Sequence, residues 1–131
     1  MYNFRKLLVY EKELKLNKDV KIKTNIFPKK ESFSLTSQLQ RTVDLIIINI
    51  TKGTSNCSNM EFAKFLENAI CSAHEYVACI DIALENKYLT KQQHKCLFEQ
   101  IYDIIAMLTS FRRNLINYYK KAAFCELFSE N

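Results

Sequence analysis

Glycine and proline are almost absent from the sequence, because Gly53 and Pro28 are the only residues of their types among 131. A chain with so little turn chemistry is predicted to consist of long helices joined by few connections. The two residues are then expected to mark helix ends. We predict that Gly53, in the left-handed conformation, closes one helix and that another ends before Phe27-Pro28.

Membrane-spanning segments and paired cysteine motifs are absent as well. No apolar run approaches the roughly 18 residues that a membrane-spanning helix needs, and the first ten residues lack the apolar stretch of a signal peptide. The cysteines at positions 57, 71, 79, 96 and 125 are odd in number and form no Cys-x-x-Cys pair, which indicates neither a disulfide framework nor a zinc knuckle. We expect reduced thiols in a cytoplasmic protein that does not contact a membrane.

What the chain does contain is a globular composition, with 48% hydrophobic and 25% charged residues, and a net charge of +5. Residues 1–131 suffice for one hydrophobic core and are treated as a single domain. The charge is uneven, since the first 30 residues hold nine basic and three acidic groups whereas the other 101 hold ten and eleven. This asymmetry indicates either a surface that meets polyanions or a merely solvated helix face.

Two basic segments supply the candidate nucleic-acid contacts. The first segment contributes Lys12, Lys15, Lys18, Lys21, Lys23, Lys29 and Lys30, and the second contributes Arg112, Arg113, Lys120 and Lys121. Aromatic residues accompany the second segment, namely Tyr118, Tyr119, Phe124 and Phe128. We expect these rings either to stack on bases or to pack against a neighbouring subunit.

Apolar residues that recur every three or four positions predict four helices, at about residues 4–25, 34–52, 59–86 and 91–127. Capping boxes support the predicted starts of the third and fourth helices, at Ser58-x-x-Glu61 and Thr90-x-x-Gln93. The connections are short, so the predicted fold is an all-α, up-down-up-down antiparallel four-helix bundle. The last helix would be on the order of 55 Å long, and its basic end is expected to project.

The first two helices contain less regular segments. Between Leu14 and Ile22, apolar residues alternate with lysines at a strand-like spacing, and Leu45–Ile48 is an apolar run that would also suit a buried strand. We assign both segments to helices, the second because helical spacing precedes it. Polar residues near this run, Gln38, Arg41 and Asn49, are expected to form buried hydrogen bonds, with a subunit contact or phosphate site as the alternative for Arg41.

A helix that carries Leu45–Ile48 is apolar around most of its circumference. A four-helix bundle buries only one face of each helix, so the remaining apolar side chains would form a larger exposed patch than monomers normally tolerate. A second protein surface is therefore expected to cover them. The predicted oligomer interface consists of Arg41, Leu45, Ile47 and Ile48.

Metal and catalytic sites have weak support in the sequence. Cys71-x-x-His74, with Glu67 and Asp81, has spacings that permit metal ligation, but nothing else supports such a site. The chain has no Glu-x-x-His pair of the kind that di-iron bundles use, and the histidine that a zincin motif needs is replaced by Ala78. Neither histidine has a partner for nucleophilic catalysis, and no glycine-rich phosphate loop is present. We predict no enzymatic activity, no metal and no cofactor.

Several short blocks occur together along the chain, beginning with FRKLLVYEKELKL. They continue with Phe27-Pro28-x-x-Glu31, Leu35-Thr36-x-Gln38, Asn49-Ile50-x-x-Gly53 and Glu61-Phe62-x-x-Phe65-Leu66. From about Phe4 to Leu115 the chain resembles the four helix bundle protein family encoded in intervening sequences of bacterial large-subunit ribosomal RNA genes. It departs from that family at Tyr10, where a tryptophan is expected, at Ser34, where a glycine is expected, and at Thr51-Lys52, which replaces Ala-Glu.

The resemblance implies a non-enzymatic, oligomeric, nucleic-acid-associated protein. The family is related to the accessory variability proteins of diversity-generating retroelements, which resemble it in fold, assemble as homopentameric barrels, and bind a reverse transcriptase and nucleic acid. The leading hypothesis is therefore a homopentameric accessory protein that binds the phosphate backbone of RNA or DNA and serves a reverse transcriptase. The alternatives are a structural module of the rRNA intervening-sequence family that binds only protein, and a metal-dependent enzyme.

Overall fold

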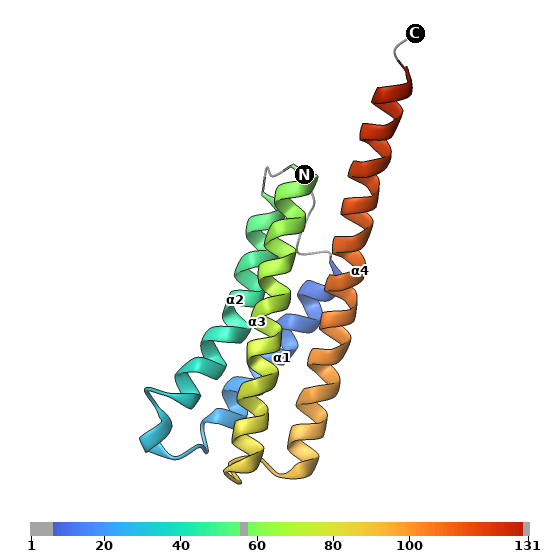
Figure 1. The fold of residues 1–131 in the computed structure, drawn as a ribbon. Coiled ribbons are helices and arrows are strands. Elements are labelled where there is room, and N and C mark those ends of the chain that lie inside the picture. Colours follow the sequence, from blue (N-terminus) through green and yellow to red (C-terminus); the bar gives the residue numbers. More distant parts are fainter. Residues whose placement is uncertain (1–6, 56–57, 130–131) are drawn as a thin grey trace.

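The computed structural model describes residues 7–55 and 58–129, and this part of the chain forms a bundle of four α-helices (Figure 1). The helices are α1 (Leu8–Thr24), α2 (Leu35–Thr54), α3 (Asn59–Glu85) and α4 (Lys91–Ser129), with a 3-10 helix, η2 (Lys29–Glu31), between the first two. Each helix runs antiparallel to its two neighbours, and α4 returns to pack against α1. The predicted all-α four-helix bundle is confirmed.

Apart from the start of the first helix, the predicted helix boundaries agree with the structure to within about two residues. Both irregular segments are helical, since Leu14–Ile22 lies in α1 and Leu45–Ile48 lies in α2. The predicted start at residue 4 is too early, because Leu7 is extended and α1 begins at Leu8. Both helix caps are present: the Ser58 hydroxyl accepts a hydrogen bond from the Glu61 amide at 3.2 Å, and Thr90 and Gln93 cap each other reciprocally at 2.9 and 3.1 Å.

The hydrophobic core extends along all four helices but ends before α4 does. Its largest fully buried apolar side chains are Leu16, Leu39, Ile46, Ile50, Phe62, Leu66, Ile80, Ile101, Ile104 and Leu108. Beyond Leu115, no side chain that the structure describes is buried, although α4 continues for more than three turns. Figure 1 shows this end of α4 rising past the other helices, as the length of the predicted helix implied.

The prediction that Gly53 closes a helix in the left-handed conformation is wrong. Gly53 is buried inside α2, which continues to Thr54, and its φ is not positive. A Cβ atom at this position would lie 2.6 Å from Cδ1 of Phe62 and 3.2 Å from Cβ of Phe65, both on α3. Glycine is therefore required here because it lets α2 and α3 approach closely. The left-handed residue among those described is Lys87, with φ of 64°, in the connection to α4.

We predict that Gly53→Ala destabilises the protein. The added methyl group gains about 1 kcal/mol of helix propensity, but overpacking against a buried ring costs typically about 1 to 3 kcal/mol. Phe62 is 2% exposed and packs on Phe111 at a ring-centroid distance of 5.1 Å, so its ring has little freedom to move. Urea denaturation should show a lower midpoint for the variant.

The matched control for this prediction is the same substitution in a Phe62→Ala background. Once the ring is removed, the largest steric cost disappears, and the gain in helix propensity is opposed only by the looser contact with Cβ of Phe65 at 3.2 Å. Gly53→Ala should then become neutral or stabilising. An equal loss of stability in both backgrounds would show that Phe62 is not the reason for the glycine.

Candidate interaction surfaces

The outward face of α1 and the adjoining η2 carry unpaired lysines. Lys15, Lys18, Lys29 and Lys30 are exposed, Lys23 is half-buried, and none of the five has an ion-pair partner in residues 7–55 or 58–129. Lys12 and Lys21 differ, because Lys12 pairs with Asp103 on α4 and the Nζ atom of Lys21 lies 3.2 Å from Oδ1 of Asp44 on α2. The predicted basic segment thus contains five lysines without an ion-pair partner among the described residues, called the free lysines below, and two lysines, Lys12 and Lys21, that form ion pairs with neighbouring helices.

A shallow groove of about 540 Å³ lies between α1 and α2, beside the free lysines. Leu14 and Ile22 supply apolar lining, and Lys18 and Lys21 line it together with the side-chain amides of Asn17, Asn25 and Gln40. Lys21 and Asn17 both contact Asp44, and Gln40 donates to Thr24. Lys18 is therefore the lining ammonium group that is available for a phosphate oxygen.

The second predicted basic segment lies on the projecting end of α4. Arg113, Lys120 and Lys121 are exposed without an ion-pair partner among the residues described, whereas Nη2 of Arg112 lies 3.4 Å from Oε2 of Glu67 on α3. Tyr118 and Phe124 are exposed on the same extension, while the side chains of Tyr119 and Phe128 lie outside the description. This end of α4 and η2 lie at opposite ends of the bundle (Figure 1), so the two basic segments do not form one site.

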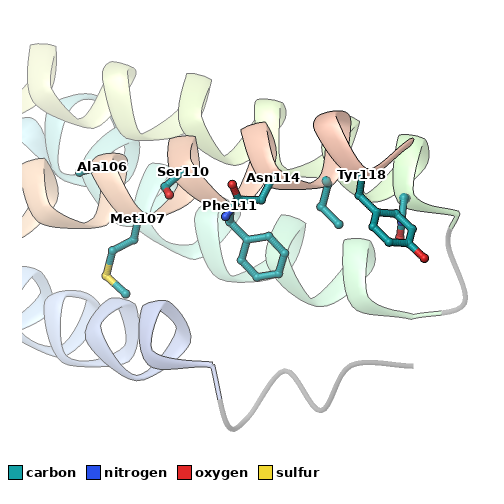
Figure 2. A pocket seen from close by; sticks show the side chains of 8 residues that line it. Ala106, Met107, Ser110, Phe111, Asn114 and Tyr118 are labelled. Carbon is teal, nitrogen blue, oxygen red and sulfur yellow. The ribbon is translucent and has the colours of Figure 1, made fainter. Parts of the chain in front are cut away.

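A larger groove, of about 900 Å³, follows α4 where it leaves the bundle (Figure 2). Met107, Phe111 and Tyr118 supply most of its apolar lining, and Ser110 and Asn114 supply hydroxyl and amide groups. Among the residues described, no charged side chain lines it. Its chemistry suits an apolar partner surface better than a phosphate backbone.

The predicted oligomer interface is divided between two sides of α2. Arg41, Leu45 and Ile48 share one outward stripe at a spacing of four and three residues, with Ile48 43% exposed and Leu45 half-buried. Ile47 is also half-buried but lies two turns after Gln40, whose side-chain amide donates a hydrogen bond to the Thr24 hydroxyl of α1 at 3.0 Å. The structure therefore places Ile47 on the side of α2 that faces α1.

The expectation of buried hydrogen bonds near this interface holds for one residue of three. Asn49 is buried, and its side-chain amide donates to the Leu45 carbonyl at 2.8 Å within the same helix. Gln38 and Arg41 are exposed instead, because both fall on the outward side of α2. Arg41 is therefore available for a subunit or phosphate contact.

A buried acid, Glu13, was not among the residues predicted from the sequence. Its side chain is fully buried on the face of α1 that also carries Val9, Leu16 and Val20. Neither carboxylate oxygen has a hydrogen-bond partner in the described part of the chain, and the same is true of the buried Tyr76 hydroxyl on α3. The signal was present in the sequence, since position 13 lies four residues after Val9 and three before Leu16.

The environment of Glu13 favours its neutral form. Burial, with a smaller contribution from the charge of Asp44, raises the pKa of Glu13 to about 9. Burial, followed by the charges of Glu13 and Asp19, raises the pKa of the Tyr76 phenol. A carboxyl group without solvent exposure cannot meet a substrate, so we assign Glu13 to the packing of α1 rather than to catalysis.

The structure separates the residues that had metal-compatible spacing. Glu67 pairs with Arg112, Asp81 contacts Nε2 of His94 at 2.8 Å, and Cys71 and His74 are exposed on α3. In the residues described, no group of three or more His, Cys, Asp or Glu side chains could hold a metal ion. The described cysteines, Cys71, Cys79, Cys96 and Cys125, are free thiols.

The fold and these surfaces define a small all-helical bundle with a basic outer face. The sequence model of the 23S rRNA-intervening sequence protein family matches residues 5–110, and the chain belongs to this family. A crystal structure of a protein of unknown function from the S23 ribosomal protein family of Bacteroides thetaiotaomicron is similar, with a TM-score of 0.73 and 20% identity. The match covers 81% of this chain and 96% of that one, and at this identity it shows the fold alone. No curated protein matches.

The described helices are amphipathic and of limited apolar character. None of them combines the length and the apolar character that crossing a bilayer requires.

We predict that the protein becomes less stable as the pH rises from about 4.5 to about 9. The folded state holds the Glu13 proton over this range, whereas the unfolded state, in which the carboxyl group has its ordinary pKa of 4.5, releases it. Stability is therefore highest below the unfolded pKa and falls as the pH rises, by about 3 kcal/mol at pH 7 from this group alone.

The test compares Glu13→Gln and Glu13→Leu with the unmodified protein by urea denaturation at several pH values. Glu13→Gln should flatten the pH dependence because it cannot ionise, and Glu13→Leu should be the most stable form at pH 7. A pH dependence that survives in Glu13→Gln would assign the titration to another group.

Proposed function

We propose that this protein is a non-enzymatic, homo-oligomeric accessory protein that binds the phosphate backbone of RNA or DNA. The observation that carries this proposal is the set of lysines on α1 and η2 without ion-pair partners in the described residues, Lys15, Lys18, Lys23, Lys29 and Lys30. The other basic residues of α1, Lys12 and Lys21, are neutralised by Asp103 and Asp44. Free charge on one face attracts polyanions because phosphate binding releases counterions.

The outward stripe of α2 supports self-association. Ile48 leaves 43% of its surface exposed beside Leu45 and Arg41, which is the composition of an interface with an apolar centre and a cationic rim. A ring would repeat the free lysines around one rim and so turn a weakly basic chain into a strongly basic particle. The number of five subunits, and a reverse transcriptase as protein partner in the cytoplasm, come from the resemblance to the accessory variability proteins.

The second candidate function is a structural module of the rRNA intervening-sequence family that binds protein alone. The observation that favours it is the groove of about 900 Å³ beside α4, whose described lining is uncharged. The dependence of binding affinity on salt concentration distinguishes the two candidate functions. Phosphate binding weakens steeply between about 50 and 200 mM salt, whereas an apolar protein contact does not.

We predict that the double variant Lys15→Glu/Lys18→Glu binds nucleic acid more weakly than the unmodified protein, whatever the sequence. Loss of two phosphate contacts should also lower the slope of log affinity against log salt by about 2. Fluorescence anisotropy with a labelled oligonucleotide at several salt concentrations measures both effects.

The matched control, Lys64→Glu/Lys87→Glu, reverses the charge of two exposed lysines outside α1 and η2. It changes the net charge by the same amount as Lys15→Glu/Lys18→Glu. This variant should retain most of the affinity, because the loss depends on position and not on net charge. Equal weakening by both double variants would mean that α1 is not the binding face.

We predict that Ile48→Asp dissociates the oligomer without unfolding the subunit. Light scattering coupled to size exclusion should give a mass near five chains of 15.4 kDa for the unmodified protein and a much smaller mass for the variant. The control is Ile82→Asp on α3, because Ile82 has a similar exposure, 49% against 43%. Ile48 is a sharper test than Ile47, whose half-buried side chain also packs toward α1.

A monomer at micromolar concentration would overturn the interface on α2. A dimer or a tetramer that Ile48→Asp dissociates would retain the interface and overturn the number of subunits.

A further inference from the structure

Three rings lie in sequence along one face of α4. His94, Phe98 and Tyr102 follow one another at intervals of four residues, with ring-centroid distances of 6.1 Å for each neighbouring pair. The interplanar angles are 15° and 29°, so the rings are close to parallel. Phe98 is 39% exposed and Tyr102 is 66% exposed. Aromatic faces that are stacked on one side and open on the other form a surface on which a further flat group can stack.

A small groove continues from the open end of this row. It has a volume of about 270 Å³, begins at Tyr102 and ends at Arg113, and has Ala106, Thr109 and Ser110 among its lining residues. Side chains on a helix lean toward its N-terminus, and this applies to Tyr102 and Arg113 alike, so the eleven-residue rise of about 16 Å between them is retained. The groove therefore has an aromatic ring at one end and a guanidinium group at the other, at a separation that different nucleotides of one strand can span.

The charges around this groove favour an anionic occupant. Arg113 has no ion-pair partner in the described residues, and Lys95 and Lys120 are exposed on the same side of α4, at helical spacings from Tyr102 and Arg113. Two acids lie near Tyr102: Asp103 is paired with Lys12 of α1, and exposed Glu99 lies one turn after Lys95. Lys12 and Lys15 of α1 line a separate small groove together with Asp103. The positive charge at this groove therefore comes mainly from Arg113 and Lys120.

We propose that Phe98, Tyr102 and Arg113 form a site for single-stranded nucleic acid, in which a base stacks on Tyr102 and Arg113 binds a phosphate further along the same strand. This proposal rests on the proposed nucleic-acid function, and it adds that α4 selects the single-stranded form. A duplex covers both faces of each base with its stacked neighbours, so only an unpaired base can meet the ring. The lysines of α1, by contrast, contact phosphates that both forms present.

The experiment measures anisotropy with a labelled 20-nucleotide single strand and with the same strand in a duplex. The variants are Tyr102→Ala, Tyr102→Phe and, as a control at an exposed apolar side chain outside the proposed surfaces, Ile82→Ala on α3, where Ile82 is 49% exposed and Tyr102 66%. We expect Tyr102→Ala to weaken single-strand binding by roughly tenfold, as loss of one base-ring stack does, and to leave duplex binding unchanged. Tyr102→Phe and Ile82→Ala should bind as the unmodified protein does. Circular dichroism of each variant verifies that the bundle is intact.

Each other result overturns a definite part of the proposal. Single-strand binding that is insensitive to Tyr102→Ala, or lost equally in Ile82→Ala, overturns the α4 site and leaves the lysine face of α1 in place. No binding of either probe at low salt overturns the proposed function and the site with it. A change in oligomeric state on Tyr102→Ala, without a change in single-strand affinity, assigns this face to subunit contact and overturns the site.

Discussion

The close contact between Gly53 of α2 and Phe62 of α3 sets the geometry on which the other helices depend. A hydrogen atom in place of a methyl group lets the Phe62 ring lie against the α2 backbone. On its other side, this ring packs on Phe111 of α4 at 5.1 Å. Because buried rings transmit small displacements through a closely packed core, the glycine indirectly fixes where α4 leaves the bundle. The groove beside α4 and the projecting basic end are positioned by the same contact.

The helix α1 is attached by a different kind of interaction. Besides its apolar face, it uses the contacts Asn17–Asp44, Lys21–Asp44, Asp19–Gln100 and Lys12–Asp103 to reach α2 and α4. Glu13 adds an uncompensated buried carboxyl group, which weakens the packing of α1 whenever the group is ionised. The helix that presents the free lysines thus also makes polar contacts with both of its neighbours. Charge on α1 contributes to contacts within the chain and, under the proposed function, to attraction of a polyanion.

Much of the fold could be predicted because helical periodicity and capping boxes are local signals. The role of Gly53 could not, since a glycine that permits a close helix contact looks the same in the sequence as one that ends a helix. Glu13 was missed because charged residues are rarely buried without a partner, although its spacing from Val9 placed it on the buried face. Among the candidate site residues, the separation of Ile47 from Ile48, and of Lys12 from Lys15, depends on which side of each helix faces a neighbour. Periodicity alone does not supply that orientation.

The last part of α4, beyond Ile116, is a helix without a core. It continues a packed helix and so needs no nucleus of its own, but without burial each added residue contributes only the small free energy of helix propagation. This end of the chain is therefore governed by a helix-coil equilibrium of its own, largely independent of bundle unfolding. A partner that covers Tyr118, Phe124 and Leu127 would shift that equilibrium toward helix, and part of the binding free energy would be used to order the chain. Affinity for such a partner would then depend on temperature through helix formation as well as through contact.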